Sequence, residues 1–172
     1  MRNYKELLKN ITTLIFDYDG VLTDCKVYLI NNDFARTANV RDGYAMQLAI
    51  KKGYRVAIIS GGKSESMEQR MNALNVSDVF LGVSDKLTFY RQYLKENKIP
   101  AESVLFMGDD IPDYQVMLEA GLPVCPADAA EEIKSISAYI SHKSGGEGCA
   151  RDVIEQVLKA QGNWFDGEAF HW

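Results

Sequence analysis

Short apolar runs alternate along the chain with longer stretches in which apolar residues recur at helical spacing. The apolar runs predict strands at residues 12–19, 55–60, 78–83, 103–109, 122–126 and 138–143. The stretches between them predict helices at residues 43–52, 64–75, 86–97, 112–120, 129–136 and 148–160. This alternation is typical of α/β proteins in which helices cover both faces of a parallel sheet. We therefore predict one Rossmann-like domain spanning residues 1–172.

Two segments depart from the alternation. Residues 25–42 contain two β-prone arms around Asn31, Asn32 and Asp33, which tolerate turn conformations, so we predict a β-hairpin inserted after the first strand. The C-terminal tail, about residues 162–172, holds two tryptophans and two phenylalanines outside any clear helix. Exposed aromatic side chains usually dock on a surface, which here is either the protein's own body or a neighbouring molecule.

Composition narrows the range of partners. The formal net charge is −5 and both signs are scattered along the chain, so we expect no binding to nucleic acid. No apolar stretch reaches the length needed to cross a bilayer, and we expect no membrane association. The three cysteines, Cys25, Cys125 and Cys149, lie far apart and fit free thiols in a reducing compartment, which predicts a cytoplasmic protein. A small molecule or another copy of the chain is the expected partner.

Acidic residues gather where predicted strands end. Asp17 and Asp19 close the first strand, and Asp109, Asp110 and Asp113 follow the fourth. In open α/β sheets the carboxyl ends of the strands meet at one edge, where ligands bind. Converging carboxylates repel one another unless a cation lies among them. A hard divalent ion with oxygen ligands, Mg²⁺, is therefore the predicted cofactor.

The same edge is predicted to hold groups that bind an anion. Ser60 ends the second strand and offers a hydroxyl, while Gly61 and Gly62 leave backbone N–H groups accessible. Lys86, at the start of a predicted helix, adds a compact positive charge. Together these groups predict a phosphate-binding cradle beside the metal.

The spacing of the first acidic pair fits phosphoryl transfer. Side chains two residues apart on a strand project in the same direction, so Asp17 and Asp19 would face one phosphorus. Phosphoryl transfer asks a protein mainly for positioning and charge stabilisation. We therefore predict that Asp17 is the nucleophile and that Asp19 protonates the leaving oxygen and later activates water.

Four motifs now stand in order along the chain: "FDYDGVLTD", "ISGG", the isolated Lys86 and "GDDIPD". In this order and spacing they resemble the four motifs of the haloacid dehalogenase superfamily of phosphatases. The resemblance covers nearly the whole chain, and four ordered motifs are far more specific than any one of them alone.

This resemblance implies roles for the acidic residues. Asp17 would be the nucleophile, and Asp19 the acid and base, with its backbone carbonyl bound to Mg²⁺. Asp109 would be the other protein ligand of the metal. Asp110 and Asp113 would orient metal-bound waters and the motif lysine.

A narrower resemblance rests on "DGVLTD", the hairpin, "NVRDGYAMQLA", "GGEGCARDVIEQVLKAQGNW" and the absence of a cap domain. These features resemble the small capless phosphatases that act on 3-deoxy-D-manno-octulosonate 8-phosphate, a phosphorylated sugar acid of lipopolysaccharide biosynthesis. The resemblance implies a homotetramer assembled through the hairpins. It also implies that a neighbouring subunit, including its C-terminal tail, helps to close each active site.

One position departs from that pattern. The octulosonate phosphatases usually carry an arginine, and the related phosphatases of nine-carbon sialic-type acid 9-phosphates a glutamate, where this chain has Gly62. "NVRDG", which contains Arg41, resembles the octulosonate group and keeps its substrate as the first prediction. Arg41, Lys63 and Arg70 are the candidates for binding a substrate carboxylate, together with Gly61 and Gly62 in the loop; a solvated surface role is the alternative for each basic residue.

Two other functions use similar residues. A signalling receiver domain also has an aspartyl phosphate, a metal, a hydroxyl residue and a lysine on a parallel α/β fold, but its acidic pair precedes the phosphorylated aspartate. In this chain the paired aspartates, Asp109 and Asp110, come late, so the motif order argues against a receiver. A phosphotransferase or mutase that passes the phosphoryl group to a sugar is the second alternative. Without a cap to exclude water, hydrolysis is the expected outcome.

Overall fold

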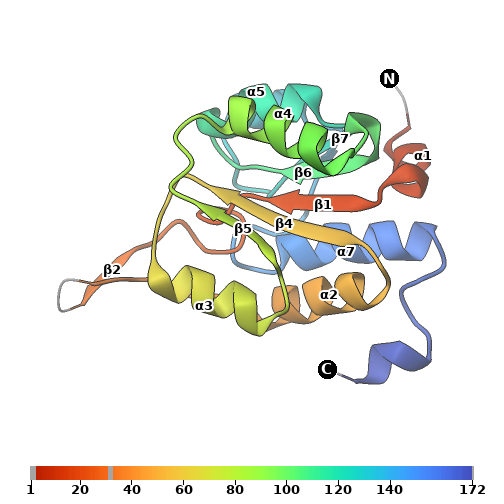
Figure 1. The fold of residues 1–172 in the computed structure, drawn as a ribbon, viewed down its shortest axis with the longest axis horizontal. Helices are drawn as coiled ribbons and strands as arrows, with labels where there is room; N and C mark the ends of the chain where they lie inside the picture. Colours follow the sequence, from red (N-terminus) through yellow and green to blue (C-terminus); the bar gives the residue numbers. More distant parts are fainter. Residues whose placement is uncertain (1–2, 31–32, 172) are drawn as a thin grey trace.

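A six-stranded parallel sheet forms the centre of the protein (Figure 1). The computed structural model describes residues 3–30 and 33–171. The strands run in the order β5-β4-β1-β6-β7-β8 across the sheet. Their bounds are β1 Thr13–Phe16, β4 Arg55–Ser60, β5 Asp78–Leu81, β6 Val104–Met107, β7 Leu122–Cys125 and β8 Tyr139–Ile140. This arrangement confirms the predicted fold class, and each strand overlaps its predicted range.

Helices cover both faces of the sheet. One face carries α1 Tyr4–Leu7, α2 Val40–Lys51, α3 Glu65–Ala73 and α7 Cys149–Ala160, and the other carries α4 Lys86–Asn97, α5 Tyr114–Glu119 and α6 Glu131–Ile136. Four short 3₁₀ helices complete the list: η1 Leu8–Asn10, η2 Ala101–Ser103, η3 Ile111–Asp113 and η4 Gly167–Phe170.

The central strand β1 shows why two layers of helices are needed. Every side chain of β1 is buried: Leu14 and Phe16 enter the core shared with α2 and α7, whereas Ile15 enters the core shared with α4 and α5. Successive side chains of a strand point to opposite faces, so a fully buried strand must be covered on both. The carboxyl end of β1 is thereby packed from both sides.

Helix boundaries differ from prediction where local capping decides them. Helix α4 has the predicted bounds, and Asp85 caps it by accepting a hydrogen bond from the Thr88 N–H at 3.0 Å. Helix α2 begins earlier than predicted because the Asn39 side chain caps the Arg41 N–H at 2.9 Å. The helix predicted at 112–120 divides into η3 and α5, and helix α1 was not predicted.

The predicted hairpin is present as β2 Tyr28–Ile30 paired antiparallel with β3 Asp33–Ala35. It projects away from the body of the protein (Figure 1). The expected turn residues Asn31 and Asn32 lie outside the described residues. Within the described part of the chain, the segment between β1 and α2 contains this hairpin and no cap domain. No helix among the described residues is long and apolar enough to cross a membrane.

The C-terminal tail docks on its own body over residues 163–171. The Tyr44 hydroxyl of α2 donates a hydrogen bond to the Ala169 carbonyl at 2.5 Å, and Lys52 pairs with Asp166 at 2.5 Å. The guanidinium of Arg151 lies 5.0 Å from the centre of the Trp164 ring. Of the two surfaces that the sequence left open for the aromatic tail, the protein's own α2–α7 face is the one it contacts here.

Candidate active site

The predicted catalytic residues emerge at the carboxyl ends of three adjacent strands. Strand β1 lies between β4 and β6 in the sheet. Asp17 follows β1 directly, Ser60 is the last residue of β4, and Asp109 follows β6 after one glycine. Because parallel strands end at the same edge, three segments that are far apart in the sequence meet there.

Three carboxylates and one lysine form a compact cluster in which Asp17, Asp113 and Lys86 are buried and Asp109 is partly buried. Asp17, Asp109 and Asp113 each offer a carboxylate oxygen, and these oxygens all lie within 4.8 Å of one another. Lys86 Nζ lies 3.0 Å from Asp17 Oδ1 and 2.7 Å from Asp113 Oδ1. The Lys86 side chain is only 6% exposed, so its charge is directed almost wholly at these acids. The cluster confirms that the first, third and fourth motifs converge in space.

Two glycines allow the loops to approach this closely. Gly20 has φ of 91°, and a Cβ built there would lie 2.0 Å from Asp109 Oδ2. A Cβ at Gly108 would lie 2.5 Å from the Cβ of Asp113. The Asp113 carboxylate also accepts a hydrogen bond from the Asp109 N–H at 3.3 Å, which ties the two acids together. Any side chain at either glycine would force the carboxylates apart.

Burial and mutual repulsion change the acidity of the cluster. Burial, aided by the charges of Asp17 and Asp113, raises the pKa of Asp109 to about 7. Burial and the charge of Asp17 raise the pKa of Asp113 to about 7, against the opposing effect of Lys86. Burial also raises the pKa of Asp17. For Lys86, burial acts to lower the pKa, but Asp17 and Asp113 outweigh it and the pKa is raised.

These residues fit a hard divalent cation. Asp17 Oδ1 is buried and accepts no hydrogen bond of good geometry, even though the Lys86 charge is near. One lysine cannot neutralise three neighbouring carboxylates, whereas a doubly charged ion among them would remove the repulsion. The donor set is entirely carboxylate oxygen, the type that Mg²⁺ prefers.

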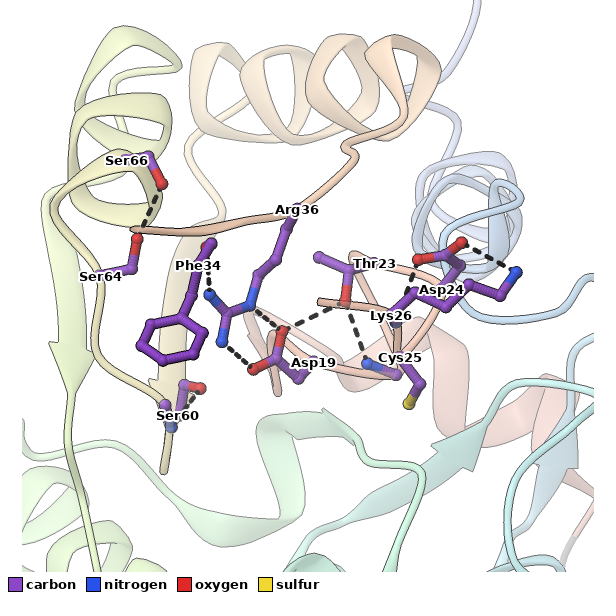
Figure 2. A network of polar contacts seen from close by, with 12 residues as sticks. Asp19, Thr23, Asp24, Cys25, Lys26, Phe34, Arg36, Ser60, Ser64 and Ser66 are labelled. Atoms are coloured by element: carbon purple, nitrogen blue, oxygen red, sulfur yellow. Dashed lines mark hydrogen bonds and ion pairs between the residues drawn. The ribbon is translucent and has the colours of Figure 1, made fainter. Parts of the chain in front are cut away.

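The second acid of the first motif has different partners. Arg36 Nε lies 2.6 Å from Asp19 Oδ1, and a terminal nitrogen of the same guanidinium donates to Asp19 Oδ2 at 3.0 Å. The Thr23 hydroxyl donates to Asp19 Oδ1 at 3.3 Å. Figure 2 shows Arg36 reaching across from the segment after the hairpin to this carboxylate.

Sequence reasoning missed both Thr23 and Arg36. Thr23 stands four residues after Asp19 in "DGVLTD", and this short spacing was a usable signal for a local hydrogen bond. Arg36 carried no such signal, since it is one basic residue in a β-prone arm and its contact depends on the path of the chain.

The predicted cradle lies beside Asp19. Ser60 is buried, and its hydroxyl oxygen accepts a hydrogen bond from the Gly62 N–H at 3.2 Å. A Cβ at Gly62 would lie 2.9 Å from Asp19 Oδ2 and 3.5 Å from Ser60 Oγ. Gly61 is exposed next to them. The loop after β4 therefore approaches the first motif as closely as a backbone without side chains can.

Other predicted residues lie outside the carboxylate cluster. Asp110 is exposed and caps η3 by accepting the Ile111 N–H at 2.8 Å. Lys63 is exposed over the loop that follows β5, and Arg70 lies against α2 at Gly43. Arg41 lines a cleft of about 630 Å³ between the start of α2 and the start of α7. The described lining of that cleft includes no residue of the cluster, so the structure does not bring Arg41 to the catalytic acids.

The fold and the site together are typical of enzymes that transfer phosphoryl groups. A buried aspartate at the end of the central strand, a lysine held against it, and further carboxylates placed for a divalent cation are the parts that phosphoryl transfer requires.

Known enzymes resemble this chain in sequence and fold over most of its length. Residues 78–152 match the family of haloacid dehalogenase-like hydrolases. The chain is 39% identical over 155 residues to the 3-deoxy-D-manno-octulosonate 8-phosphate phosphatase KdsC of Salmonella typhi, covering 90% of this chain and 82% of that protein. The KdsC protein of Yersinia pestis is 37% identical over 153 residues, covering 88% and 82%.

Solved structures agree with these relatives. The crystal structure of 3-deoxy-D-manno-octulosonate 8-phosphate phosphatase from Yersinia pestis has a TM-score of 0.91 at 35% identity, covering 94% of this chain and 88% of that one. The phosphatase from Moraxella catarrhalis, in complex with a magnesium ion, a phosphate ion and KDO, has a TM-score of 0.91 at 32% identity and covers 95% and 94%. The chain belongs to the haloacid dehalogenase-like hydrolases. The family resemblance drawn from the four motifs is confirmed, as is the class of phosphoric monoester hydrolase.

Proposed function

We propose that the protein hydrolyses 3-deoxy-D-manno-octulosonate 8-phosphate to the free sugar acid and phosphate, with Mg²⁺ as cofactor. The observation that carries this proposal is the cluster in which Asp17 lies against Lys86 and beside Asp109. The names of the relatives in Salmonella typhi and Yersinia pestis support the choice of substrate. The magnesium ion in the Moraxella catarrhalis complex supports the choice of metal.

Asp17 and Asp109 are the proposed side-chain ligands of the ion, joined by the backbone carbonyl of Asp19. Asp113 is placed to orient them, since it contacts both the Asp109 N–H and Lys86. Asp110, which is exposed, is proposed to orient metal-bound water. When bound, the ion would neutralise the acids and polarise a phosphoryl oxygen.

In the proposed reaction, a carboxylate oxygen of Asp17 attacks phosphorus and the bond from phosphorus to the ester oxygen breaks. Asp19 gives its proton to the departing sugar oxygen. Water then attacks the phosphorus of the aspartyl phosphate, Asp19 takes a proton from that water, and the bond to Asp17 breaks. The net change is one ester and one water converted to one alcohol and phosphate.

The remaining groups hold the phosphoryl oxygens. The Ser60 hydroxyl and the Gly61 N–H are proposed as donors, while the Gly62 N–H holds the Ser60 oxygen at 3.2 Å. Lys86 supplies positive charge to the phosphoryl group during transfer. Lys63, which follows Gly62 directly, is proposed for a further substrate contact. Arg41 and Arg70 remain proposed substrate contacts, and Arg70 lines a pocket together with Tyr18 of the first motif.

We also propose that the protein assembles as a homotetramer in which a neighbouring subunit closes each active site. Apolar side chains cover the hairpin and stay exposed in the single chain: Val27, Tyr28, Leu29, Ile30 and Phe34. Such an apolar ribbon is the kind of surface that symmetric association buries. Light scattering on wild-type protein and on Leu29→Asp tests this: a tetramer that dissociates in the variant supports it, and a wild-type monomer contradicts it.

A phosphate-release panel with Mg²⁺ tests the proposed activity. It compares 3-deoxy-D-manno-octulosonate 8-phosphate with a nine-carbon sialic-type acid 9-phosphate, a hexose 6-phosphate and p-nitrophenyl phosphate. The proposal expects the highest kcat/KM for the eight-carbon acid. A higher kcat/KM for the nine-carbon acid ester would instead assign the protein to the phosphatases of sialic-type acid 9-phosphates. A phosphorylated Asp17 that persists for minutes without turnover would instead indicate the receiver function.

A further inference from the structure

A glycine-rich segment lies directly against the loop of the first motif. This segment, residues 144–148 with the sequence "SGGEG", is called the glycine segment below. A Cβ built at Gly145 would lie 2.0 Å from the carbonyl oxygen of Gly20, and Gly145 is buried. The next residue, Gly146, donates its N–H to the Val21 carbonyl at 3.0 Å. Two backbones approach this closely only where a side chain is missing, so the glycine segment packs on the loop without room for a substitution.

Asp128 holds the glycine segment from its other side. Asp128 Oδ1 accepts a hydrogen bond from the Gly145 N–H at 2.9 Å. Asp128 lies in the turn that follows β7, and in the same turn the Ala130 N–H donates to the Asp109 carbonyl at 2.9 Å. This turn therefore contacts the fourth motif directly and the first motif through the glycine segment.

The two motifs joined in this way supply the proposed ligands of the metal. Their loops meet at Gly20, where a Cβ would lie 2.0 Å from Asp109 Oδ2. Gly20 has φ of 91°, and its carbonyl is the atom that the glycine segment approaches. The carbonyls of Asp19 and Gly20 belong to adjacent peptide planes, which are related only by the φ and ψ of Gly20. A displaced Gly20 carbonyl would therefore also turn the backbone carbonyl of Asp19.

We propose that Asp128 is a positioning residue of the phosphoryl-transfer site: through the glycine segment it fixes the backbone carbonyl of Asp19 relative to the carboxylate of Asp109. This inference rests on the proposed function for the presence of the ion and of the reaction. Asp128 acts through the backbone and makes or breaks no covalent bond. Its contribution is geometric, because a divalent ion with oxygen ligands binds well only when those ligands are held at the right separation.

The charge of Asp128 is the competing explanation, since a carboxylate near the site would attract a cation directly. The acidic oxygens that lie within 4.8 Å of one another belong to Asp17, Asp109 and Asp113, a group that does not include Asp128. Asp128 is also exposed, so solvent screens its charge. The two explanations make different demands on the side chain. Positioning needs an oxygen that accepts the Gly145 N–H, whereas attraction needs the negative charge.

The test compares wild-type protein with Asp128→Asn, Asp128→Ala and Gly145→Ala. Asparagine keeps the acceptor oxygen and removes the charge, whereas alanine removes both. The control for the Asp128 variants is Glu147→Ala, which removes an exposed acid of the same segment. The control for Gly145→Ala is Gly167→Ala, because nothing lies within 4 Å of a Cβ at position 167.

Three measurements are made on each protein. Amide hydrogen exchange of residues 17–24, in the absence of metal, reports how firmly the loop of the first motif is held. Thermal unfolding at increasing Mg²⁺ concentration gives the concentration of half-maximal stabilisation and shows whether the fold is kept. Steady-state kinetics on 3-deoxy-D-manno-octulosonate 8-phosphate and on p-nitrophenyl phosphate separate kcat from KM.

In Asp128→Ala we expect faster exchange of the loop amides. The Mg²⁺ concentration of half-maximal stabilisation should rise by roughly 10-fold and kcat should fall by a similar factor, as for the loss of one hydrogen bond to a charged group. KM should change by less than about threefold, because the groups proposed to bind the phosphoryl oxygens are unchanged. Asp128→Asn should stay close to wild type in all three measurements. Gly145→Ala should show the pattern of Asp128→Ala with larger changes, and if it does not fold, the two Asp128 variants still decide.

Equal losses in Asp128→Asn and Asp128→Ala would overturn the inference, because the charge rather than the hydrogen bond would then be responsible. Unchanged exchange, Mg²⁺ dependence and kcat in Asp128→Ala would overturn it as well. A lower melting temperature with wild-type Mg²⁺ dependence and kcat would make the contact purely structural. Failure of the proposed function has a different signature, since the wild-type protein would then release no phosphate from either ester, while exchange in the metal-free protein would still report on Asp128.

Discussion

Among the residues that the structure describes, carboxylates are buried in two regions, and only one of these regions brings several acids together with a lysine. Asp42, near the start of α2, is 2% exposed and accepts the Arg151 N–H at 2.7 Å, while its second oxygen has no hydrogen-bond partner. Burial raises its pKa to about 6. In the catalytic crevice burial raises the pKa of Asp109 and Asp113 to about 7.

The comparison shows that a raised pKa alone does not mark an active site, because burial produces it in both regions. What distinguishes the crevice is convergence. Three acids that follow two strands meet the lysine that begins α4, and one carboxylate oxygen of each acid lies within 4.8 Å of the others. Asp42 has one backbone donor and serves to join α2 to the start of α7. Four experiments separate these two kinds of buried acid.

The largest effect is expected from Asp17→Asn. The amide cannot act as a nucleophile on phosphorus, so phosphate release should fall by at least about 10³-fold. The side chains have the same shape and the change removes one repelling charge, so the fold should be kept. Steady-state kinetics with Mg²⁺ measure the effect, and Asp42→Asn, which changes the other buried acid, should stay close to wild-type activity. Full activity in Asp17→Asn would refute the mechanism.

Lys86→Met should destabilise the protein by about 3 kcal/mol at neutral pH, because it leaves Asp17 and Asp113 buried without their cation. Urea unfolding in the absence of metal measures the free energy of unfolding. The control is Lys134→Met, which removes the partner of the exposed Glu131 and should cost less than about 1 kcal/mol. Similar losses in the two variants would contradict the buried ion-pair network.

Adding Mg²⁺ should stabilise the wild-type protein by about 2.7 kcal/mol when its free concentration is a hundred times the dissociation constant. The increase should be absent or much reduced in Asp109→Asn, which lacks a proposed ligand, and retained in Asp42→Asn. Thermal unfolding at several Mg²⁺ concentrations provides the comparison. Equal stabilisation of all three proteins would mean that the ion binds elsewhere.

The smallest effect concerns Asp42 itself. Its folded-state pKa of about 6 lies above its ordinary value of 3.8, so between these values the folded protein holds a proton that the unfolded chain has lost. Stability from this group is therefore lost as the pH rises through that window. Relative to wild type, Asp42→Asn should be more stable at pH 7 than at pH 4 by roughly 2 kcal/mol.

Asp85→Asn is the control of opposite sign for that experiment. The Thr88 N–H lowers the pKa of Asp85, so this acid stabilises the folded state once the pH exceeds its ordinary pKa and loses that contribution in acid. Asp85→Asn should therefore lose stability relative to wild type as the pH rises. A shift of the same sign in both variants would contradict the assigned burial of Asp42.

Much of the site was predictable because its signals are local. The apolar run before Asp17 predicts both a buried strand and the point where it ends. Helix α4 begins where predicted because Asp85 caps it directly before Lys86. Capping also explains why the predicted start of α2 was wrong, since the Asn39 cap that lengthens this helix lies outside the apolar pattern. Arg41, a predicted substrate contact, lines a cleft with the start of α7, a neighbourhood that no local pattern encodes.

The sequence by itself determined the sheet, the order of the motifs and the position of the proposed nucleophile at a strand end, because hydrophobic period and strand-end chemistry act over a few neighbouring residues. Tertiary structure alone decided the partner of each charge. Asp19 meets Arg36 because the hairpin returns its chain to the crevice and Gly62 leaves room there, and the tail rests on α2 because Tyr44 and Lys52 hold it. Such contacts depend on the path of the backbone through space, which spacing along the chain does not specify.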